Sequence, residues 1–161
     1  MELFRLALLA AALLTAKCER RPPAPVVPPT DYEAWVHWGI NEERRRVGLL
    51  PLAWDDRLAE QARAHSRRMA EAGFFDHRDP ELGALADRLA RARIRCFTCA
   101  ENIFQEQGHL NPPALAIEHW MKSPGHRANA LSPAFHRTGV GVAFRRDGMH
   151  FFTQILTGGR R

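Results

Sequence analysis

The C-terminal segment of the chain carries the clearest strand signal, and it limits the fold more than any other feature. Two apolar runs, TGVGVAF from residue 138 to 144 and FFTQIL from residue 151 to 156, flank the dipeptide Asp147-Gly148. Such a dipeptide between apolar runs predicts an antiparallel hairpin with a two-residue type I′ turn. The predicted strand pairs on one face are Arg146 with Met149, Phe144 with Phe151, Val142 with Thr153 and Val140 with Ile155.

On the opposite face of this hairpin, the first strand carries only very small side chains or none. It holds Gly139, Gly141 and Ala143, which the same register sets against Phe152, Gln154 and Leu156. Because glycine and alanine leave little side chain in the way, a helix can approach this face closely. The segment therefore predicts a sheet covered by a helix, and the chain as a whole is expected to be a layered α+β domain.

Four longer helices are expected before this hairpin. The first spans residues 31 to 47, with Asp31 as its N-cap and Gly48 after its end, and the second runs from residue 55 or 56 to 72 and ends at Gly73. The third begins at Pro80 and turns Leu82, Leu85 and Leu89 inward. The fourth begins at Pro112-Pro113, directly after the N-cap Asn111. In the second helix, His65 shares a stripe with apolar residues, so it is interpreted as a hydrogen-bonded core residue. Residues 93 to 97 and 100 to 104 are expected to be short strands or irregular edges.

The N-terminus indicates export. An apolar run from Leu6 to Leu14 follows Arg5 and is too short to span a bilayer, so residues 1–18 are interpreted as a signal peptide. Lipidation of Cys18 is the alternative, and Lys17 disfavours it because a charge stands where a small residue is expected. Residues 19–30 are proline-rich and predict an extended tether, which leaves residues 31–161 as one folded domain.

This organisation predicts a protein that is secreted, periplasmic or held at the cell surface. Membrane contact is expected only if Cys18 carries lipid. The chain has a formal net charge of +5, with arginines that are interpreted as a solvated surface. Its arginine runs at 44–46 and 145–146 are not interleaved with aromatic residues, and export argues against a nucleic-acid partner. A lipid, a cell-wall component or a protein remains open as the ligand.

Cys96 and Cys99 are the only cysteines after residue 18. In an oxidising compartment this pair favours a local disulfide over a metal site, which would need a second pair of ligands. A thioredoxin-like redox role needs a βαβ setting that the sequence does not indicate. Free thiols remain the alternative to the disulfide.

The segment WMKSPGHRANAL, residues 120–131, places a histidine at a defined point. Ser123 is a good N-cap residue and Pro124 suits the first helical position, so His126 becomes the third residue of a short helix. The positive end of the helix dipole disfavours an imidazolium there, and a neutral ring can bind a metal or accept a proton. The alternative is an ordinary hydrogen-bonded histidine.

A second histidine, His77, follows the second helix on a predicted loop, and Glu101 lies close to the cysteine pair. These two residues and His126 form the one candidate polar cluster. Their separations of 24 and 25 residues are not a local motif, so the residues alone leave open whether they meet in space.

Four blocks in this order resemble a secreted bacterial, SCP-like member of the CAP superfamily of cysteine-rich secretory, antigen 5 and pathogenesis-related proteins. They are residues 41–77 ending in FFDH, AENIF at 100–104, WMKSPGHRANAL, and TGVGVAF followed by FFTQIL. The resemblance implies an α-β-α sandwich with a central antiparallel sheet and a cleft lined by two histidines and two acids. His77, Glu101 and His126 match three of these four positions. Ser123 stands where many animal and plant members have a glutamate.

Two histidines and a carboxylate are a suitable ligand set for zinc or another divalent metal, so His77 and His126 are candidate metal ligands. Glu101 is the candidate catalytic base, a further ligand, or a partner that orients a histidine. The expected function is a non-enzymatic binding module with this cleft. A metal-dependent, peptidase-like hydrolase is the alternative, although no HExxH motif is present. A third hypothesis is a structural domain in which the three side chains only satisfy one another.

Overall fold

The computed structural model describes residues 31–159. The predicted signal peptide and the whole predicted tether, residues 1–30, lie outside the described residues, as do residues 160 and 161. None of the helices among residues 31–159 is long and apolar enough to cross a membrane.

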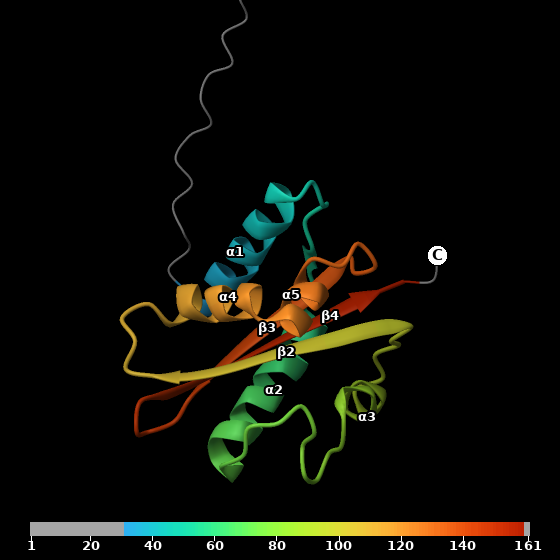
Figure 1. The fold of residues 1–161 in the computed structure, drawn as a ribbon. Helices are drawn as coiled ribbons and strands as arrows, with labels where there is room; N and C mark the ends of the chain where they lie inside the picture. The colour runs from blue at the N-terminus through green and yellow to red at the C-terminus, as the bar shows by residue number, and fades with distance from the viewer. Residues whose placement is uncertain (1–30, 160–161) are drawn as a thin grey trace, which may run out of the picture.

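The fold has three layers, with helices on both faces of one mixed sheet (Figure 1). The elements are α1 Tyr32–Arg46, β1 Ala53–Trp54, α2 Asp56–Ala72, α3 Leu85–Arg91, β2 Thr98–Gln107, α4 Pro112–Lys122, α5 Pro124–Ala130, β3 Arg137–Phe144 and β4 Met149–Gly158. The sheet order is β1-β3-β4-β2; β1 runs parallel to β3, and the other pairs are antiparallel. The expected α-β-α sandwich is confirmed, with one short parallel strand added at its edge.

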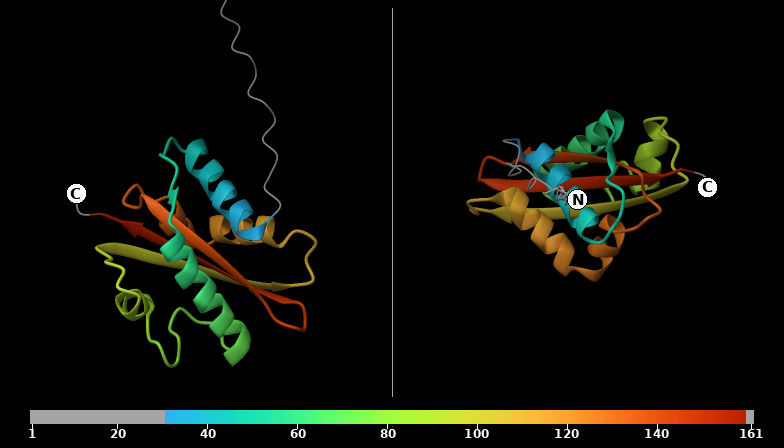
Figure 2. Two further views of the ribbon diagram at one scale, coloured as in Figure 1. Left: turned by 180° about the vertical axis from the view of Figure 1, so that it is seen from behind. Right: turned by 90° about the horizontal axis from the view of Figure 1, so that it is seen from above.

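Each face of the sheet has its own core. On one face α1 and α4 place Val36, Ile40 and Trp120 against Val140 and Phe152. The other face packs α2 and α3 against the sheet, and its core includes Leu58, Ala62, Leu89 and Ile155. Figure 2 shows α4 and α5 on one side of the sheet and α2 and α3 on the other. Because β2 is an edge strand, groups from both outer layers can reach its free side.

The predicted register of the β3–β4 hairpin is wrong by one residue. Phe144 pairs with His150 and Val142 with Phe152, because the loop is longer than a two-residue turn. Gly148 takes a left-handed φ of 90°, and its N–H donates to the carbonyl of Arg145 at 2.9 Å. A left-handed residue that closes a three-residue loop shifts every later pair by one position.

The small face of β3 does receive a helix, as predicted. A Cβ added at Gly139 would lie 2.0 Å from the backbone nitrogen of Ala59, and one at Gly141 would lie 2.0 Å from that of Arg63. Both neighbours belong to α2, which therefore packs against the sheet backbone itself. The residues that β4 contributes to this face are Phe151, Thr153 and Ile155, instead of the predicted Phe152, Gln154 and Leu156.

Local capping signals set the starts of three helices. Asp31 accepts a hydrogen bond from the N–H of Ala34, Asp55 accepts from Leu58, and Asn111 accepts from Ala114. These contacts satisfy N–H groups that have no partner inside the helix. The predicted starts of α1, α2 and α4 are confirmed.

The third helix begins at Leu85, five residues later than predicted from Pro80. Residues 79–83 form a tight loop, in which the Asp79 carboxylate accepts hydrogen bonds from the N–H groups of Glu81 and Leu82. Gly83 closes the loop with a left-handed φ of 86°. Proline therefore opens a turn here, because the neighbouring aspartate satisfies the backbone donors.

One strand replaces the two short pieces that were expected between residues 93 and 104. β2 pairs with β4 along ten residues, from Thr98 opposite Gly158 to Gln107 opposite Met149. Residues 93–97 are not part of any strand. The long pairing places Glu101 and Asn102 side by side near the middle of the edge strand, with their side chains on opposite faces of the sheet.

Candidate functional site

Glu101 is the centre of the candidate site. It lies on β2, and only 3% of its side chain is exposed. Its Oε2 accepts a hydrogen bond from Nη2 of Arg88 at 2.6 Å, and its Oε1 lies 3.1 Å from Nδ1 of His77. The Nε2 atom of His65 lies 3.8 Å from the same Oε1. Both carboxylate oxygens of Glu101 are therefore already engaged by protein groups.

His77 forms the wall of the site on the α2 side. It follows α2 in a loop, and 54% of its side chain is exposed. Two buried side chains hold the backbone of this loop. Arg88 donates to the carbonyl of His77 at 3.2 Å, and Nε2 of His65 lies 3.0 Å from the carbonyl oxygen of Asp76. The hydrogen bond to Glu101 raises the pKa of His77, with burial opposing it. His65 is almost fully buried, as interpreted from its place on the α2 stripe.

His126 forms the wall on the α5 side, as the third residue of that helix. Its ring centroid lies 6.3 Å from that of His77. Burial lowers the pKa of His126, and the charge of His77 lowers it further. The expected neutral ring is thus favoured, but by burial and a neighbouring histidine. The Nδ1 atom of His126 is buried and has no hydrogen-bond partner among the described residues.

Side-chain amides hold α5 against β2. Asn102 is fully buried, and its Nδ2 donates to the carbonyl of His126 at 3.2 Å and to Oε1 of Gln154 at 3.1 Å. Nδ2 of Asn129 donates in turn to Oδ1 of Asn102 at 3.0 Å. This network fixes the position of His126 relative to β2.

Arg44 fixes the chain that leaves α5, and it corrects the interpretation of the arginines as a solvated surface. It is 2% exposed, and its guanidinium donates to backbone carbonyls. The acceptors are Leu50, Ala130, Ser132 and Phe135. A buried arginine with this many acceptors acts as a tie between α1 and the segment after α5.

Ser123 stands between α4 and α5 as the N-cap residue of α5, but its side chain makes no capping hydrogen bond. Within residues 31–159 no hydrogen bond joins its side chain to His77, Glu101 or His126. The cysteine pair forms a disulfide, with Cα atoms 5.8 Å apart. Cys99 is already part of β2, so the closed loop leads directly into the strand that carries Glu101.

Arg88 and Asn102 are the site residues that the sequence analysis missed. Arg88 was missed because the residue type alone does not show whether an arginine is buried. The start of its helix was also predicted five residues too early. Asn102 had a usable signal, since it directly follows Glu101 in the AENIF block and a polar residue on each face of one strand needs partners in both layers.

The comparison with known proteins decides the family. Residues 39–156 match the model of the cysteine-rich secretory protein family, CAP. The chain belongs to the CAP family. It is 39% identical over 110 residues to the uncharacterized protein YkwD of Bacillus subtilis, an alignment that covers 68% of this chain and 42% of that protein. This CAP chain therefore spans about two fifths of the length of that curated relative.

Solved structures agree with this assignment. An extracellular protein containing an SCP domain from Bacillus anthracis superposes with a TM-score of 0.71 at 34% identity, over 80% of this chain and 40% of that one. The structure of NaASP2 with Zn²⁺ has a TM-score of 0.53 at 12% identity, over 81% of this chain and 83% of that one, and shows a shared fold alone. The CAP fold is thus established for this chain.

Proposed function

We propose that this CAP domain is an exported, non-enzymatic binding module, and that the cleft between His77 and His126 holds a polar group of a cell-envelope component. The observation that carries the proposal is the engagement of Glu101. Arg88 neutralises its charge and occupies one oxygen at 2.6 Å, and His77 occupies the other at 3.1 Å. A general base needs a lone pair directed at the substrate, and this carboxylate has its oxygens directed at protein donors.

Glu101 then has a positioning role. When Nδ1 of His77 donates to Glu101, Nε2 of the same ring is left for a ligand. The raised pKa of His77 favours the protonated ring, while the lowered pKa of His126 favours a neutral ring. The pair thus offers N–H donors on His77 and a neutral imidazole on His126, which suits a polar or anionic group.

Export supports a ligand in the cell envelope. The similar Bacillus anthracis protein is described as extracellular, and the N-terminus of this chain predicts a signal peptide. The disulfide between Cys96 and Cys99 fits an oxidising compartment. The net charge of +5 favours anionic partners such as lipid headgroups or wall polymers.

The test is a binding panel of lipid vesicles, sterols and peptidoglycan fragments, with the recovered ligand analysed for cleavage. We expect saturable binding to one class, weakened by His126→Ala, and ligand that is recovered intact. His119→Ala is the matched control, because His119 lies on α4 with its ring beside Phe104 and away from the cleft. Hydrolysis of the ligand, abolished by Glu101→Gln, would contradict the proposal.

A metal-dependent hydrolase is the second candidate, and the short distance between the two histidine rings is the observation that supports it. Their centroids are 6.3 Å apart, and Nδ1 of His126 has no partner within the described residues. No group of three or more His, Cys, Asp or Glu among residues 31–159 is arranged to hold a metal ion, so His77 and His126 would be the only protein ligands. A bound zinc would supply Lewis-acid activation of water.

The metal hypothesis has its own readout. Zn²⁺ should raise the Tm of the wild type and leave that of the His77→Ala, His126→Ala double variant unchanged. Equal Tm shifts in both proteins, or no shift in either, would contradict the hypothesis of a metal site at these two histidines. Turnover of a peptide library that depends on Zn²⁺ and on Glu101 is needed before the protein is called a hydrolase.

A further inference from the structure

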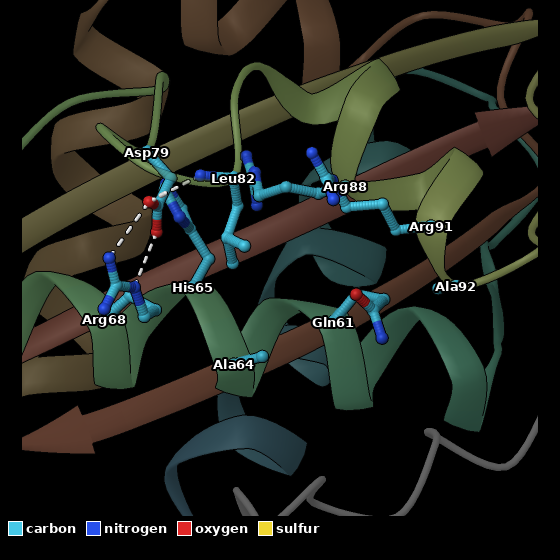
Figure 3. Close-up of a pocket in the computed structure, with 9 residues that line it drawn as sticks. All are labelled: Gln61, Ala64, His65, Arg68, Asp79, Leu82, Arg88, Arg91 and Ala92. Carbon is cyan, nitrogen blue, oxygen red and sulfur yellow. Dashed lines mark hydrogen bonds and ion pairs between the residues drawn. The ribbon is translucent and has the colours of Figure 1, made fainter.

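A cavity lies between α2 and the segment from Asp79 to Ala92. It has a volume of about 300 Å³, which is at the small end of the range for small-molecule sites. Figure 3 shows the Arg88 side chain extending from α3 above α2, towards His65 and the Asp79 loop. His77 and His126 do not line this cavity.

One buried side chain at this cavity has donors without partners. Arg88 is 5% exposed; its Nη2 is used by Glu101 and by the carbonyl of His77, but its Nε and Nη1 are buried and unpaired within the described residues. Nδ1 of His65 is also unpaired there, but it is an acceptor, because Nε2 of that ring donates to the carbonyl of Asp76. Native proteins rarely leave buried donors unsatisfied. The two Arg88 nitrogens therefore indicate an acceptor that the protein itself does not supply.

The charge of the cavity defines the acceptor. Its lining holds three arginines and one carboxylate, Asp79. Asp79 is already bonded to Arg68, at 2.9 Å from Nε and 3.2 Å from Nη2. Arg91, in contrast, makes no recorded ion pair or hydrogen bond among residues 31–159. Arg88, whose charge is paired with Glu101, therefore leaves unused donors, and Arg91 adds a positive charge without a partner among residues 31–159.

Part of the remaining wall is apolar, beside the polar residues Gln61 and His65. Leu82 and Ala64 line the cavity, together with Ala92 at its end. A fully hydrated inorganic ion would leave this surface unused. A molecule with one anionic end and an apolar body would contact both kinds of wall.

We propose that this cavity binds a small carboxylate-bearing molecule, with the carboxylate at Arg88 and Arg91 and the apolar body against Leu82 and Ala64. The unpaired Arg88 nitrogens carry the proposal, because a carboxylate is the acceptor that a guanidinium binds best. The ligand would also contact Arg88, which holds Glu101 in place. Binding in the cavity would therefore change the surroundings of Glu101, which also contacts His77. This site is separate from the proposed envelope-binding cleft, and either can fail without the other.

The test is a titration of the purified protein with benzoate, followed by two-dimensional amide NMR. Benzamide, which has the same shape without the charge, and inorganic phosphate are the comparison probes. We expect saturable benzoate shifts in α2 and α3, with benzamide and phosphate at least about tenfold weaker, which corresponds to the loss of one charge-assisted contact. Equal binding of benzamide, binding of phosphate alone, or absence of benzoate binding at millimolar concentration would overturn the proposal.

Variants locate the site. Arg91→Gln should weaken benzoate binding about fivefold and leave the fold intact, since Arg91 is exposed and no hydrogen bond or ion pair joins it to another described residue. Arg67→Gln is the matched control, because Arg67 is an exposed arginine of α2 that does not line the cavity. Equal weakening by both variants would show only general charge attraction and would overturn the assigned site.

Discussion

The two walls of the cleft are held in different ways. His126 lies on the short helix α5, which begins at Pro124. The side-chain amide of Asn102 on β2 holds this helix by donating to the backbone carbonyl of His126. His77 stands on a loop with no regular structure, and a buried ion pair between Arg88 and Glu101 supports it. The comparison teaches that one site can combine a short helix held by buried side-chain amides with a loop held by a buried charge pair. The second wall should be the more fragile.

The largest effect is expected from Arg88→Ala. The variant leaves the Glu101 carboxylate buried without its cation, and breaking a buried pair in this way costs about 3–5 kcal/mol. Urea unfolding followed by circular dichroism measures the loss. Arg91→Ala, on the same helix, is the control and should change stability by less than about 0.5 kcal/mol. Similar values for the two variants would contradict the assigned role of the ion pair.

Asn102→Ala tests the other wall and should have a smaller effect. It removes the donor to the carbonyl of His126 and the acceptor of Asn129, so about 2 kcal/mol of stability should be lost. Chemical unfolding gives this value, and the amide signals of α5 should shift more than those of the His77 loop. An Asn102→Ala loss greater than that of Arg88→Ala would reverse the comparison.

These two predictions also separate what the sequence could predict from what it could not. Asp31, Asp55 and Asn111 cap helices through contacts at most three residues away, so α1, α2 and α4 were predictable. The hairpin register was not, because it depends on the backbone conformation of a single residue, Gly148. A one-residue difference in loop length was enough to move every pair.

The proximity of His77, Glu101 and His126 was predictable only through the family resemblance. The two histidines and Glu101 come from different layers and meet because β2 is the edge strand, which no local pattern shows. Arg88 was missed for a related reason. Its partner Glu101 lies 13 residues away on another element, and the helix that carries Arg88 begins after an aspartate-capped loop that resembles a helix start.

The loop under the His77 wall should lose stability in acid. The hydrogen bond from Arg68 holds the pKa of Asp79 well below its usual range. A carboxyl with a depressed folded-state pKa contributes stability that is complete above its unfolded-state value, about 3.9, and is lost as the pH falls towards its folded-state pKa.

Asp79→Asn measures this contribution. The variant should lose about 2 kcal/mol at pH 7 and much less near pH 2, because below about pH 3.9 the unfolded wild type takes up a proton on Asp79, and this offsets most of the contribution. Thermal unfolding at several pH values is the measurement. A difference between the two proteins that stays constant with pH would assign the effect to packing instead of charge.

The smallest expected effect is on the titration of the two histidines. NMR should show a pKa for His77 above the usual 6.5 and one for His126 below it. The raised pKa contributes stability at low pH that is lost as the pH rises through it, and the lowered pKa contributes stability at high pH that is lost as the pH falls through it. These contributions oppose one another, so ring signals must be followed individually.

Glu101→Gln separates the two titrations. The pKa of His77 should fall, since its largest cause is removed while burial remains. The pKa of His126 should rise slightly or stay unchanged, because a less charged His77 repels a proton on His126 less strongly. A fall in both values by the same amount would contradict the different support of the two walls.

The central claim is that the cleft binds an envelope component between two histidines and leaves it chemically unchanged. The most direct measurement titrates the protein with the peptidoglycan fragments or lipid vesicles that it retains, while recording the ring signals of His77 and His126. The account predicts that both rings shift together and saturate with one affinity, and that the ligand is recovered intact. Binding that leaves both ring signals unmoved, or a ligand recovered in hydrolysed form, would contradict it.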